Sequence, residues 1–250
     1  MIITPVKTRI FNPPKDDLLS AIGTALPRLS EKSILAVTSK VVSIWEGSCI
    51  HQSEVNNKDD LIRREADYYL LRAKHGARIM LTLKKNFLIP TAGIDESNAN
   101  GYYILWPKNP KQSAKRLYDW ARKTYNIKNC GVIITDSHSV PLRRGVMGFS
   151  LAHWGFEPLN DYRGRRDLFG RELKMTQANT PDALAAAAVL VMGEGNERTP
   201  LAIIRDVRFV RFTEKPRRSR KEFSSYEVPL EEDIYAPILK GMKWKKGGQK

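Results

Sequence analysis

Hydrophobic and polar positions alternate along the chain in short blocks that predict a mixture of strands and helices. Runs rich in β-branched or aromatic residues predict strands at 1–6, 33–38, 102–106 and 132–134. Strand-like pieces also lie between residues 78 and 89, and residues 201–212 are expected to form one or two strands. The apolar residues at 132–134 are continuous, which is typical of a buried strand.

Apolar residues at helical spacing predict helices at 16–26, 58–73, 111–125 and 182–192. Asp16 and Asp17 stand at the start of the first helix, where negative charge interacts favourably with the helix dipole. Thr180 and Pro181 form the expected start of the last helix, with the hydroxyl as cap and the proline in the first turn. This last helix is so rich in alanine that its backbone must pack very closely on a neighbour.

Polar segments next to these elements supply candidate binding residues. Ser39 and Lys40 follow the strand at 33–38 as a polar turn or a helix start, and Lys40 could reach a phosphate as a point charge. A lone lysine is more often a surface residue. Residues 91–98 form a polar turn in which Asp95 is either a metal ligand or a residue that caps the turn. The local sequence leaves both pairs of alternatives open.

The stretch 131–172 carries the densest candidate chemistry. Asp136 follows the strand at 132–134, and open α/β sheets usually hold ligands at such strand ends. Glycines at 145, 148, 155, 164 and 170 are interleaved with Arg143, Arg144, Arg163, Arg165, Arg166 and Arg171. Glycine lets the backbone approach a ligand, arginine matches phosphate and carboxylate oxygens, and aspartate oxygens suit divalent cations. The stretch indicates either a metal–phosphate site or a glycine-rich loop whose Asp and Arg residues pair with each other.

Length and charge set the class of protein. A chain of 250 residues can bury the core of one large domain or two small ones. The formal charge of +15 is concentrated in two runs: Lys215, Arg217, Arg218, Arg220 and Lys221, then Lys240, Lys243, Lys245, Lys246 and Lys250. Such runs favour anionic partners, although most form solvated surface. Nucleic-acid binding through this basic tail is the alternative function, but no RNP motif, zinc finger or recognition helix accompanies it.

Several familiar sites are excluded. Cys49 and Cys130 are too few for a disulfide framework or a metal knuckle. There is no phosphate loop of the Walker type, no H-E-x-x-H and no G-x-S-x-G. His138 and His153 lack metal-ligand spacing, so structural roles are expected for both. Without a signal-like N-terminus, and with no apolar stretch longer than 183–192, a cytoplasmic protein without membrane spans is expected.

Four ordered motifs together resemble the coenzyme F-420-0:L-glutamate ligase family. They are T-A-G-I-D-E-S-N (91–98), G-V-I-I-T-D-S (131–137), D-Y-R-G-R-R-D-L-F-G-R-E-L (161–173) and A-L-A-A-A-A-V-L-V-M-G-E-G-N-E (183–197), with S-K-V-V-S-x-x-E-G (39–47) as a fifth. The resemblance spans roughly residues 1–210 and implies an unusual α+β fold built as an intertwined homodimer. It places a γ-glutamyl ligase domain at 1–213 and leaves 214–250 as a basic C-terminal extension.

The resemblance also implies a site. Asp95 and Asp136 match the ligands of one metal ion, and Ser137 and Glu194 match the positions that hold a second. The nucleotide-binding positions fall on the turn at 10–13 with Asn12, and on Ser39, Lys40, Asn98, Met192, Gly193, Gly195, Asn196, Glu197 and Thr199. The implied cofactors are GTP and two Mg²⁺ or Mn²⁺ ions, with K⁺ as a further candidate.

The implied reaction is the joining of the α-amine of L-glutamate to an acceptor carboxylate. The acceptor carboxylate attacks the γ-phosphate of GTP, and the amine then displaces phosphate from the acyl phosphate. Asp136 takes part as a metal ligand, and Arg143, Arg163 and Arg171 are candidates to hold substrate carboxylates by bidentate pairing.

Two departures from the family pattern concern the nucleotide and acceptor sides. Ile44 stands where relatives often have lysine, and the pattern D-T-x-G-R-P is replaced by Asp136-Ser137-His138-Ser139-Val140-Pro141. The acceptor is therefore predicted only as an anion, either the deazaflavin F-420-0 or a folate.

Overall fold

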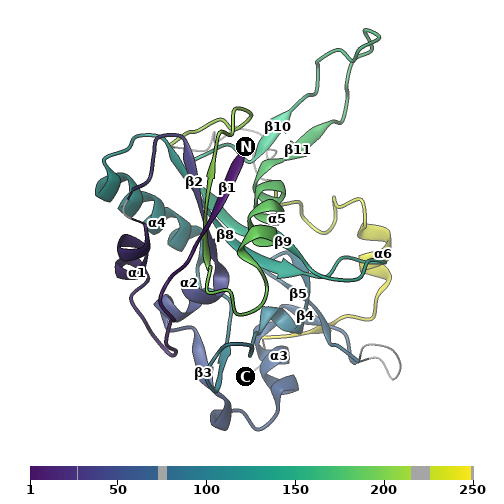
Figure 1. Ribbon diagram of the computed structural model, residues 1–250. Coiled ribbons are helices and arrows are strands. Elements are labelled where there is room, and N and C mark those ends of the chain that lie inside the picture. Colours follow the sequence, from purple (N-terminus) through teal and green to yellow (C-terminus); the bar gives the residue numbers. More distant parts are fainter. Residues whose placement is uncertain (27, 73–77, 215–225, 249–250) are drawn as a thin grey trace.

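The computed structural model describes residues 1–26, 28–72, 78–214 and 226–248, and this part of the chain has a mixed α+β fold (Figure 1). Its centre is a five-stranded sheet in the order β1–β12–β2–β8–β9. The strands are β1 (Ile2–Val6), β12 (Leu201–Arg205), β2 (Ser33–Thr38), β8 (Cys130–His138) and β9 (Met147–Trp154). β2 and β8 are parallel, whereas the other neighbouring pairs are antiparallel.

Helices cover both faces of this sheet. Leu35 and Val37 of β2 belong to a core shared with α1 (Leu18–Ala25) and α4 (Pro110–Tyr125). Ile34 and Ala36 point the other way, into a core shared with α5 (Thr180–Met192). Successive side chains of a strand face opposite sides, so a continuous apolar run is what a doubly covered strand requires. Figure 1 shows α1 and α4 on one side of the sheet and α5 on the other.

A smaller four-stranded sheet within the described residues has the order β13–β4–β5–β6. Its strands are β13 (Lys245–Lys246), β4 (Tyr68–Tyr69), β5 (Leu81–Lys84) and β6 (Phe87–Pro90). It shares a small core with α3 (Lys58–Glu65). The remaining elements are α2 (Ser39–Glu46), the pair β3 (Cys49–His51) and β7 (Tyr102–Ile104), the 3₁₀ turns Gln52–Glu54 and Thr91–Gly93, and α6 (Ala236–Gly241).

Residues 162–176 form an arm that projects from the body of the molecule (Figure 1). Its base is the antiparallel pair of β10 (Leu159–Asp161) and β11 (Gln177–Asn179). Leu168 and Phe169 on this arm are 98% and 95% exposed. Much of the predicted glycine- and arginine-rich stretch therefore lies away from the sheet.

The apolar pattern predicted most elements, including a strand within 201–212, and three predictions need correction. The predicted helix at 58–73 ends at Glu65, because Ala66 is extended and Tyr68–Tyr69 pair with β5. The strand at 132–134 continues to His138, since its polar end pairs with β9, a strand that the sequence did not predict. At 201–212, β12 is the regular strand, and Phe212 adds an isolated bridge to Phe156. Asn179, rather than Thr180, caps α5 by accepting a hydrogen bond from the amide of Asp182 at 3.1 Å.

The close packing predicted for the alanine-rich helix is confirmed within the chain itself. Ala185 and Ala188 are fully buried in the core between α5 and the sheet. Gly148 of β9 lies under the helix, and a Cβ there would stand 2.6 Å from the carbonyl oxygen of Ala185. The outer face of α5 carries Leu190, which is 84% exposed. The homodimer stays a prediction.

The chain after residue 225 returns to the body of the molecule. The Tyr226 hydroxyl donates to the carbonyl oxygen of Ser150 at 3.4 Å, and the Trp244 indole donates to the carbonyl oxygen of Leu239 at 2.7 Å. Tyr235 and Ile238 in the same segment are largely exposed. The first basic run, Lys215 to Lys221, lies outside the described residues. Within those residues, the helices lack the combination of length and apolar character that a bilayer crossing needs.

His153 on β9 predicts an acid-sensitive part of the fold. Its ring packs between Phe156 and Tyr226, and burial, with a smaller effect of the Lys111 charge, lowers its pKa to about 4. Between a pH of about 6.5 and a pH of about 4, His153 is therefore protonated in the unfolded chain and neutral in the folded chain. The free energy of unfolding should have its full value above a pH of about 6.5. It should fall by up to about 3 kcal/mol as the pH drops to about 4.

Urea unfolding of the wild type and of His153→Gln across this pH range measures the effect. The difference between their unfolding free energies should change with pH in favour of the variant on acidification. A difference that stays constant from pH 4 to 7 would contradict the assignment.

Candidate active site

A cavity of about 820 Å³ opens where the parallel strands β2 and β8 end. β2 leads directly into α2 with Ser39 and Lys40, and β8 carries Asp136 and Ser137 into the same wall. The other walls come from residues 8–12, from the segment 93–106 and from the loop after α5. The carboxyl ends of parallel strands are where α/β sheets commonly bind ligands, and this chain follows that rule with a single parallel pair.

Every residue that the sequence assigned to metal or nucleotide lines this cavity. They are Asn12, Ser39, Lys40, Asp95, Asn98, Asp136, Ser137, Met192, Gly193, Glu194, Gly195, Asn196, Glu197 and Thr199. These residues come from segments spread over most of the chain, so the fold brings together what the motifs only suggested. Their individual roles stay predictions.

Asp136 forms the most enclosed acid of the cavity. Its Oδ2 accepts a hydrogen bond from the indole N–H of Trp106, and its Oδ1 accepts one from the amide of Ser137 at 2.8 Å. Burial raises the pKa of Asp136 to about 6, against the opposing effect of these hydrogen bonds, and the nearby charge of Asp95 raises it further. A carboxylate kept out of water in this way gains from a cation beside it.

Asp95 and Glu194 complete the acidic side. The Lys40 ammonium lies 2.7 Å from Asp95 Oδ2 and also donates to the carbonyl oxygen of Ser97 at 2.8 Å. Burial alone would raise the pKa of Asp95, but Lys40 and the hydrogen bonds from Ser97 outweigh it and lower that pKa. Glu194 accepts a hydrogen bond from the Ser137 hydroxyl at 3.3 Å, and burial raises its pKa.

These donors fit divalent cations in kind. Carboxylate and hydroxyl oxygens are the hard ligands that Mg²⁺ and Mn²⁺ prefer, and Lys40 already places a positive charge among such oxygens. As the side chains stand, no three His, Cys, Asp or Glu residues of the described ranges are grouped closely enough to hold a metal ion. Ligation by Asp95 therefore requires its Lys40 contact to be exchanged for the metal.

The loop after α5 is shaped by its own hydrogen bonds. The amide of Gly195 donates to Glu197 Oε2 at 2.9 Å, and the Thr199 hydroxyl donates to the carbonyl oxygen of Met192. The Asn98 side-chain amide donates to the carbonyl oxygen of Gly195 at 3.0 Å. Two segments predicted to bind nucleotide, around 98 and 192–199, are thus joined directly.

The predicted arginines do not line the cavity. Arg143 is exposed in the turn between β8 and β9, and Arg163 and Arg171 lie on the projecting arm. Arg163 pairs with Asp161 at 2.6 Å, and Asp167 accepts the amide of Arg171 at 2.8 Å. The alternative of local Asp–Arg pairing therefore holds on the arm. The cationic side chains of the cavity wall are instead Arg9, Lys40 and Arg198.

Trp106 is a site residue that the sequence did not predict. Its indole donates to Asp136 and rests against Gly93, where an added Cβ would lie 2.3 Å from the indole nitrogen. The Lys84 ammonium lies 5.7 Å from the centre of the same ring, and Lys84 is itself nearly buried and paired with Glu65 at 3.1 Å. In the sequence, Trp106 is only the end of a predicted strand at 102–106.

Removing the indole N–H of Trp106 should leave the Asp136 carboxylate less firmly oriented, while the core around the ring stays filled. Trp106→Phe keeps an aromatic ring against Phe87 and Phe149 but leaves Asp136 Oδ2 without its hydrogen bond. Loss of such a partner of a metal ligand typically costs about 10- to 100-fold in metal affinity, so we expect about that loss for Mn²⁺ if Asp136 is a metal ligand as predicted. Calorimetric titration with Mn²⁺ and nucleotide measures it.

The matched control is Trp120→Phe, which removes an indole that packs edge-on against Tyr125, outside the cavity. Its Mn²⁺ affinity should equal that of the wild type. Equal affinities in all three proteins would mean that Trp106 does not position the carboxylate.

Comparison with known proteins adds independent information. A family model described as F420-0:Gamma-glutamyl ligase matches residues 5–206. A Coenzyme F420:L-glutamate ligase of Methanopyrus kandleri is 37% identical over 238 residues, covering 87% of this chain and 92% of the relative. The proteins of the same name from Methanococcus maripaludis and Methanocaldococcus jannaschii are 34% and 32% identical, covering 83% and 71% of this chain and 90% and 76% of the relatives. The matched span contains the whole cavity wall from Thr8 to Pro200, and the chain belongs to the F420-0:gamma-glutamyl ligase family.

Proposed function

We propose that this protein is a GTP-dependent γ-glutamyl ligase that joins L-glutamate to the carboxylate of an F420-0-type acceptor. The observation that carries the proposal is the convergence of Asp95, Asp136 and Glu194 in one cavity with Lys40 and the loop 192–199. Acids on one side and cations with backbone amides on another suit a metal-bound polyphosphate. Relatives named Coenzyme F420:L-glutamate ligase support the choice of substrates.

The proposed reaction has two steps. The acceptor carboxylate oxygen attacks the γ-phosphorus of GTP, so that its bond to the bridging oxygen breaks and GDP leaves. The α-amine of L-glutamate then attacks the acyl carbon of the resulting acyl phosphate, an amide bond forms, and inorganic phosphate leaves. Each step brings negatively charged groups together or releases one, and the cationic side chains of the cavity wall, Lys40 and Arg198, would lower the barrier by neutralising that charge.

The cavity residues divide by chemistry. Asp95, Asp136, Ser137 and Glu194 would hold two Mg²⁺ or Mn²⁺ ions, which supply charge neutralisation at the phosphate oxygens when bound. Lys40, which pairs with Asp95 in this structure, would be free to hold a phosphate oxygen if Asp95 held a metal ion. Asn12, Ser39, Asn98 and the loop 192–199 bind the nucleotide, and Arg9 and Arg198 are placed to meet further anionic groups.

Two parts of the proposal concern partners. The enzyme works as a homodimer, and the exposed arm at 162–176 with the outer face of α5 offers unpartnered apolar residues for that contact. The acceptor is the deazaflavin rather than folate, because the relatives carry the coenzyme in their names.

Mass spectrometry of the products is the direct test. The protein is incubated with L-glutamate, Mn²⁺ or Mg²⁺, GTP or ATP, and either F420-0 or folate as acceptor. An acceptor one glutamyl residue heavier, formed together with GDP, is expected for F420-0 and GTP only. A glutamylated folate would show that folate is the acceptor. The absence of a glutamylated product from both acceptors would overturn the function.

A further inference from the structure

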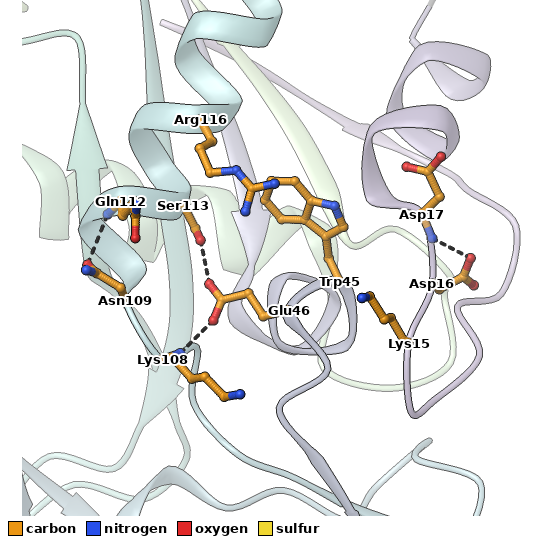
Figure 2. A pocket seen from close by; sticks show the side chains of 10 residues that line it. All are labelled: Lys15, Asp16, Asp17, Trp45, Glu46, Lys108, Asn109, Gln112, Ser113 and Arg116. Carbon is orange, nitrogen blue, oxygen red and sulfur yellow. Dashed lines mark hydrogen bonds between the residues drawn. The ribbon is translucent and has the colours of Figure 1, made fainter.

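A second hollow of about 860 Å³ lies outside the candidate active site. It is bounded by the C-terminal end of α2 with Trp45 and Glu46, by the start of α4, and by the loop around Lys15 (Figure 2). None of the residues assigned to metal or nucleotide lines it. Its chemistry is therefore separate from the one already described.

Three cationic side chains face this hollow without an acidic partner. Among the described residues, no carboxylate lies within ion-pair distance of the head groups of Lys15, Lys108 or Arg116. The Arg116 guanidinium stacks over the Trp45 ring, 4.1 Å from its centre, as Figure 2 shows. Stacking fixes the plane of the guanidinium and leaves its N–H edge available for a carboxylate.

Glu46 supplies the opposite charge at the centre of the hollow. One of its oxygens accepts the amide of Lys108 at 2.7 Å, and the other accepts the Ser113 hydroxyl. A carboxylate has about four lone-pair positions, so about two remain for a donor. In the view of Figure 2 Lys15, Lys108 and Arg116 lie on three sides of Glu46, and the ammonium group of Lys108 is directed away from the Glu46 carboxylate.

The charges of the hollow match an acidic amino acid. Asp16 is neutralised by a bidentate pair with Arg9, with both contacts at 2.6 Å, and Asp17 caps α1 through the amide of Ser20. Glu46 is suited to an ammonium group, and the three unpaired cations are suited to two carboxylates. A simple dicarboxylate would leave Glu46 facing its negative charge.

We propose that this hollow is a second, non-catalytic binding site for L-glutamate. The identity of the amino acid rests on the proposed function, in which L-glutamate is the substrate. Its ammonium binds Glu46, and its carboxylates bind Arg116 and the two lysines. An amine held by Glu46 here cannot reach the acyl group in the other cavity. The L-glutamate bound in this hollow is therefore not the molecule that reacts.

The test uses the Trp45 indole N–H as a local probe in the full-length protein. Its nuclear magnetic resonance signal is identified by its loss in Trp45→Phe, and L-glutamate, glutarate and inorganic phosphate are titrated separately. L-glutamate should shift the signal, and Arg116→Gln should weaken that binding by about tenfold or more, because a charge-assisted pair is lost. Glutarate lacks the ammonium group and should bind more weakly than L-glutamate.

Lys115→Gln is the matched control, since Lys115 is next to Arg116 but pairs with Asp119 at 2.5 Å and does not line the hollow. It should bind L-glutamate as the wild type does. A signal that glutarate or phosphate shifts as readily as L-glutamate, or that L-glutamate leaves unmoved, overturns the second site.

The proposed function is judged separately, by glutamylated product from the same preparation. Product formation with an unmoved Trp45 signal overturns only the second site, and absent product with every acceptor overturns the ligase proposal.

Discussion

Replacing Asp136 by asparagine should lower glutamate ligation by at least about a thousandfold while the fold persists. The carboxylate is enclosed at the end of β8, with its oxygens directed by Trp106 and Ser137. The amide introduced by Asp136→Asn would keep the shape and one acceptor but lose the charge that, in the proposed function, holds a divalent cation. Metal-assisted charge stabilisation is worth several kcal/mol, and each factor of ten corresponds to about 1.4 kcal/mol.

The stability of Asp136→Asn should be equal to or higher than that of the wild type, although its ligation activity falls. Burial raises the pKa of Asp136 to about 6, which means that the desolvated carboxylate costs folding free energy at neutral pH. Thermal unfolding of Asp136→Asn should therefore occur at or above the wild-type temperature. The control Asp161→Asn breaks the exposed pair with Arg163 on the arm, away from the cavity, and should leave Mn²⁺ affinity unchanged. Full ligation by Asp136→Asn at ordinary metal concentrations would remove Asp136 from the metal site.

Gly148→Ala should cost about 3 kcal/mol of unfolding free energy, the upper part of the usual range for overpacking a core. The added Cβ would lie 2.6 Å from the carbonyl oxygen of Ala185 and 2.6 Å from Val189 Cγ2. A backbone oxygen cannot rotate away, so α5 must shift off β9. Because α5 leads into the loop 192–199, nucleotide affinity should fall together with stability. Urea unfolding and nucleotide titration measure the two effects.

Gly241→Ala is the control for this substitution. Gly241 ends α6, and an added Cβ there meets no heavy atom within 4 Å. Its unfolding free energy should lie within about 0.5 kcal/mol of the wild type, as for most surface changes. A similar small change for Gly148→Ala would show that α5 is free to move on the sheet.

Local sequence signals explain which elements were predictable. The strand at 33–38 was predictable from its continuous apolar residues, and α4 was predictable from the helical spacing of its apolar residues. The end of β8 is different, because Asp136, Ser137 and His138 are polar and become a strand only by pairing with Phe149, Gly148 and Met147. Likewise α3 stops at Glu65 because Tyr68 and Tyr69 pair with strands on both sides, β13 and β5, which helical spacing cannot reveal.

The residues of the candidate site also divide into those that the local sequence predicts and those that only the tertiary structure reveals. Motifs located the residues of the cavity wall because each motif is contiguous, and the fold needed only to bring them together. Trp106 was missed because its role depends on Gly93 and Asp136, which are distant in sequence or separated by a turn. Arg143, Arg163 and Arg171 were chosen for their chemistry alone, and the direction in which the arm projects is a property of tertiary structure.

The Arg9–Asp16 pair joins the walls of the two cavities, because Arg9 lines one and Asp16 lines the other. Asp16 also accepts the amide of Asn12 at 2.9 Å, so the same loop lines both cavities. Binding free energies at two such sites are reciprocal: if L-glutamate in the hollow changes nucleotide affinity by some factor, nucleotide changes L-glutamate affinity by the same factor. Through this single carboxylate–guanidinium contact, the concentration of L-glutamate would change the affinity of the enzyme for nucleotide. The concentration of nucleotide would in turn change how much L-glutamate is bound in the hollow.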